Sequence, residues 1–212
     1  MPEAEKFSKP NTYYDRLEIA QKIAQAFDDG FSWASLEKIK DLPLVHITKT
    51  VDLESWEITQ QQYTDTRENY EQLLKIPFQH TDDPYADFRF NTRHSSEISR
   101  CEAVMERYEN RRETAPMEIH VLRLGDVAFT SCSCELYMDY QHRIQARSPF
   151  VQTFMVQLTA SDTAIGSEYL ATERAAGNKG YSAIPYSCQI SPAGGQSLVE
   201  QIVDTLNEIH KK

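Results

Sequence analysis

The segment Met117–Ser133 reads MEIHVLRLGDVAFTSCS and decides the fold class. Apolar and polar residues alternate on both sides of Gly125-Asp126, a pair typical of the tight turn between antiparallel strands. The pattern therefore predicts a β-hairpin. Helical spacing follows it, because apolar residues recur every four positions from Glu135 to Ala146. Strands and helices thus alternate in this part of the chain.

Two more elements are predicted downstream of this helix. Alternation from Phe150 to Leu158 predicts a strand, and Ser197-Leu-Val-Glu200 has the form of a capping box that opens a final helix. The apolar residues of that helix share one face: Leu198, Ile202, Val203, Leu206 and Ile209. The polar stretch from Thr159 to Pro192 lies between these elements, and loops of this kind often carry functional residues.

The first half of the chain shows mainly helical patterns. Residues 13–28 predict an amphipathic helix that ends at Gly30, and residues 32–40 predict a second one. The stretch from Pro43 to Val51 is rich in β-branched residues and predicts a strand. Helices are then predicted at 53–76 and 96–112, with a loop at 79–91 between them.

These elements predict an α/β fold, with a mixed sheet that contains a β-hairpin and has flanking helices, and with a helix-rich N-terminal half. We expect residues 1–116 to form a helix-rich segment that packs on a core formed by residues 117–212. A chain of 212 residues is long enough for one good core, so we expect the two parts to form one structural unit.

Composition narrows the range of functions. The formal charge of −10 repels phosphate backbones and anionic lipid head groups, so nucleic acid is not an expected partner. The longest apolar run is far shorter than the roughly 20 residues that a membrane helix needs, and no transmembrane segment is expected. The N-terminus MPEAEKFSKPNTYYDR lacks the apolar core of a secretion signal, which leaves the cytoplasm as the default location.

The metal-ligating residue types form no familiar motif. Four cysteines are too few for a disulfide scaffold and indicate buried thiols in a reducing compartment. The six histidines lack the paired spacing of metal sites on helices, and His46 and His120 fall within predicted strands. Glu135 follows a predicted strand and begins a predicted helix. This places its carboxylate at the C-terminal end of a strand, where the active and ligand-binding sites of α/β proteins are usually found. A carboxylate at that place is also favoured by the helix dipole, so both interpretations stay open.

The order of several short motifs resembles the second, C-terminal half of the catalytic domain of the neutral/alkaline (non-lysosomal) ceramidases. Their pattern reads LGD-(V/L)-A, Pro-Gly-Glu, Arg-Ser-Pro-Phe, Gly-Tyr-(I/V)-Pro-Thr and Gly-Gly-Tyr-Glu. The corresponding segments here are Leu124–Ala128, Glu135, Arg147–Phe150, Tyr169–Thr172 and Gly180-Tyr181. The intervals from Glu135 to Arg147 and from Tyr169 to Tyr181 match without a gap. The resemblance extends from Met117 to the final helix.

The resemblance implies a function and two site residues. Neutral ceramidases are zinc-dependent amidases that split ceramide, a lipid amide, into sphingosine and a fatty acid. Two histidines from the first half of the domain, and a glutamate and a tyrosine from the second, hold their metal. Glu135 and Tyr169 fall on these last two positions, which makes them candidate zinc ligands. Carboxylate and phenolate oxygens are hard donors that zinc accepts beside imidazole.

The same comparison leaves two main interpretations. No segment here corresponds to the family's histidines and serine nucleophile, so the chain is interpreted as a C-terminal portion that needs a separate or missing N-terminal half. In that case it is inactive and without zinc when alone. The alternative is a non-enzymatic binding domain with a degenerate site, since Ser133-Cys134 replaces Pro-Gly and Lys179 to Ser182 replaces Gly-Gly-Tyr-Glu. Glu168 is a candidate replacement carboxylate, and a third hypothesis, an unrelated hydrolase that uses His120 or His142, has no motif in its favour.

Overall fold

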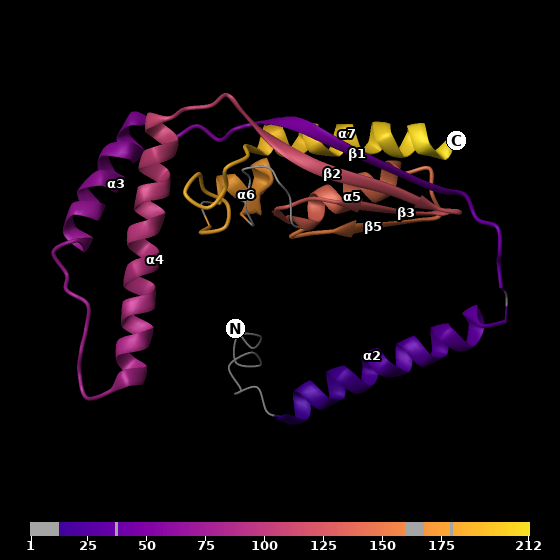
Figure 1. The fold of residues 1–212 in the computed structure, drawn as a ribbon, viewed down its shortest axis with the longest axis horizontal. Coiled ribbons are helices and arrows are strands. Elements are labelled where there is room, and N and C mark those ends of the chain that lie inside the picture. The colour runs from indigo at the N-terminus through magenta and orange to yellow at the C-terminus, as the bar shows by residue number, and fades with distance from the viewer. Residues whose placement is uncertain (1–12, 37, 160–167, 179) are drawn as a thin grey trace. The chain divides into compact units, whose positions relative to one another are not determined.

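The computed structural model describes residues 13–36, 38–159, 168–178 and 180–212, and its chain contacts define two compact units. The first unit contains helix α2 (Tyr13–Ala34), and the second comprises Pro43–Lys212 (Figure 1). The predicted helix at 13–28 is confirmed, but Gly30 does not end it. The helix continues to Ala34, and the described residues 35–36 and 38–40 are not helical, so the second helix predicted at 32–40 is wrong there. A Cβ at Gly30 would meet nothing within 4 Å, and a glycine inside a helix costs only about 1 kcal/mol.

A four-stranded mixed sheet forms the centre of the second unit. Its order is β1 (Leu44–Glu54), β2 (Thr114–Leu124), β3 (Val127–Ser131) and β5 (Gln152–Val156). The first three strands are antiparallel neighbours, whereas β5 is parallel to β3. Gly125 adopts a φ of 61° in the turn between β2 and β3, a value that glycine reaches without strain. The predicted hairpin and the mixed α/β fold are therefore confirmed.

One face of the sheet is covered by two helices. Helix α7 (Pro192–His210) packs along β1 and β2, and α5 (Met138–Arg147) packs on α7 and β5 (Figure 1). The apolar residues predicted to face the core from α7 are buried as expected: Leu198, Ile202, Val203, Leu206 and Ile209. Met117, Ile119 and Val121 of β2 meet them as part of the same cluster.

The opposite face of the sheet is largely open. Leu44, Leu124, Phe154 and Val156 are each more than 40% exposed there. His46 and His120 lie on the same face, because they alternate along β1 and β2 with the buried residues. This face therefore combines apolar side chains with a histidine pair.

A helical hairpin is inserted between β1 and β2. It consists of α3 (Gln60–Leu73) and α4 (Pro84–Glu109). Helix α3 begins only at Gln60, because β1 continues to Glu54 and Thr59 and Gln62 form a capping box. Helix α4 begins at Pro84, inside the segment predicted as a loop, because the Asp83 side chain accepts hydrogen bonds from the first turn. The predicted helix at 53–76 and loop at 79–91 are corrected accordingly.

The other elements are short or begin at unexpected places. The first two residues of the helix predicted from Glu135 form β4 (Glu135–Leu136), which pairs with β6 (Tyr169–Leu170) in a separate two-stranded sheet. Helix α6 (Glu173–Gly177) follows β6. Helix α7 begins with Ser191 as its N-cap and Pro192 in its first turn, so the predicted capping box at Ser197 lies inside the helix.

The sheet draws its strands from both sides of residue 116. Strand β1 comes from the segment expected to pack on the core, and it pairs with β2 along its whole length, from Leu44 opposite Leu124 to Glu54 opposite Thr114. Its end is tied to α7, because the Ser191 hydroxyl donates to a Glu54 carboxylate oxygen at 2.6 Å. The boundary observed in the described chain lies at residues 42 and 43.

Candidate functional site

The structure brings Glu135 and Tyr169 together. They are direct register partners in the parallel pair β4–β6, and the Glu135 N–H donates to the Glu168 carbonyl at 2.8 Å. Glu135 is exposed and Tyr169 is partly buried, so both side chains are accessible. The two residues that the family resemblance singles out are thus neighbours although 34 positions separate them in the sequence.

Tertiary contacts hold this short two-stranded sheet in place. The Leu136 N–H donates to the Gln157 side chain at 2.5 Å, and the Tyr137 N–H donates to the Leu170 carbonyl at 3.2 Å. Leu136 and Leu170 are buried in the main core. Each strand therefore directs one polar residue outward and anchors itself with a neighbouring leucine.

A second tyrosine belongs to this site. The hydroxyl groups of Tyr169 and Tyr181 lie 2.6 Å apart, and their rings meet edge to face. Tyr181 belongs to the Gly180-Tyr181 motif, which carries no assigned role in the sequence, and its fixed spacing from Tyr169 is the one sequence signal for this contact. Lys179, in the same motif, lies outside the described residues.

The phenol of Tyr169 is protonated at neutral pH, and its surroundings make the proton still harder to remove. The hydrogen bond to Tyr181 is the largest cause that raises the pKa of Tyr169, to about 12, followed by burial and by the negative charge of Glu135. A phenolate ligand at this position would need a cation to displace the proton. The Tyr169 hydroxyl is otherwise a neutral hydrogen-bonding group.

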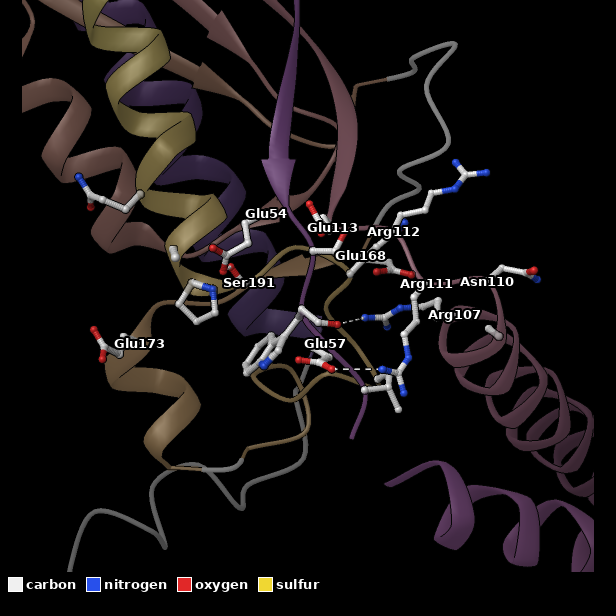
Figure 2. A pocket seen from close by; sticks show the side chains of 18 of the residues that line it. Glu54, Glu57, Arg107, Asn110, Arg111, Arg112, Glu113, Glu168, Glu173 and Ser191 are labelled. Carbon is white, nitrogen blue, oxygen red and sulfur yellow. Dashed lines mark hydrogen bonds and ion pairs between the residues drawn. The ribbon is translucent and has the colours of Figure 1, made fainter. Parts of the chain in front are cut away.

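The Glu168 backbone adjoins Glu135, whose N–H donates to the Glu168 carbonyl, but the Glu168 side chain faces a separate cleft. Glu168 lines this cleft of about 1730 Å³, whereas neither Glu135 nor Tyr169 belongs to the lining of that cleft (Figure 2). One carboxylate oxygen of Glu168 is buried and has no hydrogen-bond partner among the described residues, and the charge of the group acts on Arg107. Glu168 is therefore not grouped with Glu135 and Tyr169 as a third ligand.

The cleft itself has walls of mixed charge. Six glutamates and five arginines line it, among them an ion pair of 3.5 Å between Arg111 and Glu57 (Figure 2). The guanidinium group of Arg107, which also lines the cleft, donates to the carbonyls of Pro185, Trp56 and Cys188, at 2.5, 3.0 and 3.1 Å. These contacts connect α4 to the loop before α7. Because charges of both signs line it, the cleft favours no ligand of one charge.

The donors at the Glu135 site do not by themselves fit a catalytic zinc ion. Such an ion takes three protein ligands and a water, usually with imidazole among them. Glu135 and Tyr169 supply two oxygens. Within the described ranges, no group of three or more His, Cys, Asp or Glu side chains is arranged to hold a metal. His120 and His142, the histidines of the third hypothesis, lie on β2 and α5.

Comparisons with known proteins add no identification. A scan against protein-family models and searches of curated proteins and of solved structures found no match. Across the part of the chain that the structure describes, each helix is too short or too polar to cross a lipid bilayer.

Proposed function

We propose that this chain is the C-terminal portion of a neutral/alkaline ceramidase-like zinc amidase, which hydrolyses N-acyl sphingosines. In this proposal Glu135 and Tyr169 supply two metal ligands. A separate or missing N-terminal half supplies two histidines and the serine nucleophile. The lipid amide is bound only when both halves are present.

The observation that carries the proposal is the register of β4 and β6. Two residues singled out by ungapped motif intervals are paired one against the other, at the surface, where a further protein segment can reach them. The contact between the Tyr169 and Tyr181 hydroxyls supports it further, since it joins the two ends of the second interval.

The roles of the residues follow from their chemistry. Glu135 carries the negative charge that a dication requires, and Tyr169 offers an oxygen whose proton a bound cation displaces. The Tyr181 hydroxyl is placed to hold the Tyr169 oxygen through their hydrogen bond. In the completed site, Glu135 and Tyr169 would help to hold a zinc ion, which would supply Lewis-acid chemistry for amide hydrolysis.

The alternative is a non-enzymatic binding domain. It is favoured by the placement of the Glu168 carboxylate in a separate cleft and by the fact that the pair alone provides two donors. It differs from the first proposal in one measurable respect. In a degenerate site, the Glu135 carboxylate and the Tyr169 hydroxyl are not expected to bind one cation together.

The loss of the Tyr169 hydroxyl proton on addition of a metal ion distinguishes the amidase proposal from the binding-domain alternative. Co²⁺ at millimolar concentration should produce a tyrosinate band in the ultraviolet difference spectrum at pH 8, well below the pKa of Tyr169 of about 12. Tyr169→Phe and Glu135→Gln should each abolish the band. Tyr85→Phe, which removes an exposed tyrosine on α4, should leave it unchanged. A spectrum without the band, or a band that persists in Tyr169→Phe, would favour the binding domain.

Activity provides a second test. The isolated chain should not hydrolyse a fluorescent ceramide and should lose zinc on dialysis, because two ligands do not retain a catalytic ion. Turnover by the wild type that disappears in Glu135→Ala would mean that other residues of this chain complete the site. The genomic sequence next to the gene provides a further test. An upstream reading frame that encodes histidine ligands and a serine nucleophile would support the proposal.

A further inference from the structure

His46 and His120 form a close pair on the open face of the main sheet. Their Nε2 and Nδ1 atoms, respectively, lie 2.9 Å apart, from the adjacent strands β1 and β2. The rings are nearly parallel, at 17°, with centroids 5.1 Å apart. Both histidines are accessible, since His46 is exposed and the His120 side chain is 39% exposed.

Glu118 determines which nitrogen of His120 is free. The Nε2 atom of His120 lies 3.2 Å from a Glu118 carboxylate oxygen, which only accepts hydrogen bonds. Nε2 therefore carries the proton, and Nδ1 directs its lone pair toward His46 and toward the Thr48 hydroxyl at 3.3 Å. A carboxylate behind a histidine in this way is the arrangement that orients metal-binding imidazoles.

The spacing of the two nitrogens matches a shared metal ion. Nitrogens bound at about 2.0–2.1 Å to one metal, with an angle of roughly 90–110° between them, are about 2.8–3.4 Å apart. The observed 2.9 Å falls within this range. A dication can replace the hydrogen between the rings if His46 moves its own proton from Nε2 to Nδ1, so no net proton is lost.

We propose that His46 and His120 chelate a transition-metal dication, with Glu118 as the positioning residue behind His120. This site is independent of the Glu135 pair. Imidazole nitrogens and the general affinity order of divalent metals favour Cu²⁺, followed by Ni²⁺ and Zn²⁺. Water fills the other coordination positions, because within the described ranges no third His, Cys, Asp or Glu joins the pair as a ligand.

The cysteines do not compete for the metal. All four are buried, and burial raises the pKa of the Cys132 thiol to about 12 and that of Cys188 to about 11. Metal binding requires the thiolate. The two imidazoles on the sheet face are accessible, and imidazole nitrogen is a common ligand of these metals, which makes the pair the better donors.

Titration of the full chain with NiCl₂ by calorimetry, and with CuSO₄ by electron paramagnetic resonance, tests the proposal. We expect one equivalent of metal with two coordinated nitrogens. His46→Ala and His120→Ala should each lower the affinity at least tenfold, and Glu118→Gln should lower it about 10- to 100-fold. His80→Ala and His142→Ala, which remove exposed histidines elsewhere, should leave the affinity unchanged.

Three results would overturn the proposal. They are the absence of stoichiometric binding, binding that persists in the double variant His46→Ala/His120→Ala, and an unchanged affinity in Glu118→Gln, which would remove the positioning role. Circular dichroism verifies that the variants are folded. Glu135→Gln should bind Ni²⁺ like the wild type, so failure here and failure of the amidase proposal are separate outcomes.

Discussion

The ring of Tyr140 in α5 lies directly against Gly195 in α7. A Cβ built on Gly195 would come within 2.5 Å of the ring carbon that carries the Tyr140 hydroxyl. The single hydrogen of that hydroxyl is shared between the carbonyls of Ala171 and Pro192, whose oxygens lie 2.9 and 3.1 Å from the Tyr140 oxygen. Tyr140 thus joins the segment after β6 to the start of α7, and glycine at 195 leaves room for it.

Gly195→Ala should therefore destabilise the protein by roughly 1–3 kcal/mol, the usual cost of an overpacked core. Alanine is the better helix former by about 1 kcal/mol, so a helix without this contact would instead become more stable. Urea denaturation measures the difference. Gly177→Ala is the matched control, since a Cβ there meets nothing within 4 Å. Equal stability of Gly195→Ala and wild type would show that Tyr140 moves aside freely.

Arg107 connects the helical hairpin to the rest of its unit. Its guanidinium donates to three backbone carbonyls, and burial is the main reason that its pKa is lowered, while the charge of Glu168 acts in the opposite direction. Arg107→Met should cost roughly 2–4 kcal/mol, because three partly buried carbonyls lose their donor and the Glu168 carboxylate loses a nearby positive charge. Thermal unfolding measures this loss.

Arg100→Ala, an exposed change on the same helix, is the control for Arg107 and should stay within about 0.5 kcal/mol of the wild type. Arg107→Lys should be intermediate, since an ammonium group keeps the charge but not the fork that reaches several carbonyls. An Arg107→Met protein as stable as Arg100→Ala would contradict the anchoring role.

The ion pair between Arg147 and Glu200 predicts a dependence of stability on pH. Both guanidinium NH groups donate to Glu200, at 2.7 and 2.6 Å, and Gln196 adds a third hydrogen bond. The bond from Arg147 is the largest cause that lowers the pKa of Glu200, from 4.5 to about 2. A lowered folded-state pKa contributes stability above the unfolded value that is lost as pH falls.

Wild type should therefore be more stable than Glu200→Gln at pH 7, and the difference in melting temperature should shrink between about pH 5 and pH 2. High salt should reduce the difference as well, because both side chains are partly exposed. Glu68→Gln on α3, at an exposed site, controls for loss of one acidic charge. A constant difference across this pH range would mean that the pair does not determine the pKa.

Those parts of the fold with long periodic patterns could be predicted from the sequence. The hairpin follows from the alternation of apolar and polar residues and from the turn at Gly125. The apolar face of α7 follows from helical spacing. Both patterns arise because one face of each element is buried. The start of α7 was misplaced because Ser197 has the sequence of a cap, whereas the actual N-cap is Ser191, followed by Pro192 and a close approach of Gly194 to Glu54. The Ser-Pro pair was the better signal.

The two-residue strands β4 and β6 could not be predicted from periodic patterns, because two residues are too few to show an alternation. Their pairing is also a contact between segments far apart in the sequence. Proximity of Glu135 and Tyr169 was therefore available only through the family resemblance. The histidine pair was missed for a related reason. His46 and His120 lie 74 residues apart, and only the register of β1 with β2 brings them together.

The cysteines were predicted to be buried thiols, and the structure confirms that all four are free and buried. Their environment predicts slow chemistry. Cys132 donates to the Cys134 carbonyl at 3.2 Å, and burial raises the pKa values of Cys132, Cys134 and Cys188. Because the thiolate is the reactive form, these groups are both shielded and protonated at pH 8.

A disulfide reagent that reports free thiols should thus react with the native protein only as fast as the protein unfolds. In denatured protein, all four cysteine thiols should react with the reagent at once. Ser95→Cys, at an exposed position of α4, supplies the control, since the introduced thiol should react promptly and add one equivalent. The labelling rate of the four native cysteines should rise with urea in parallel with unfolding followed by circular dichroism. A native cysteine that reacts as quickly as the introduced thiol would show that the segment around it opens without global unfolding, and the affected residue, identified by mass spectrometry, would locate that opening.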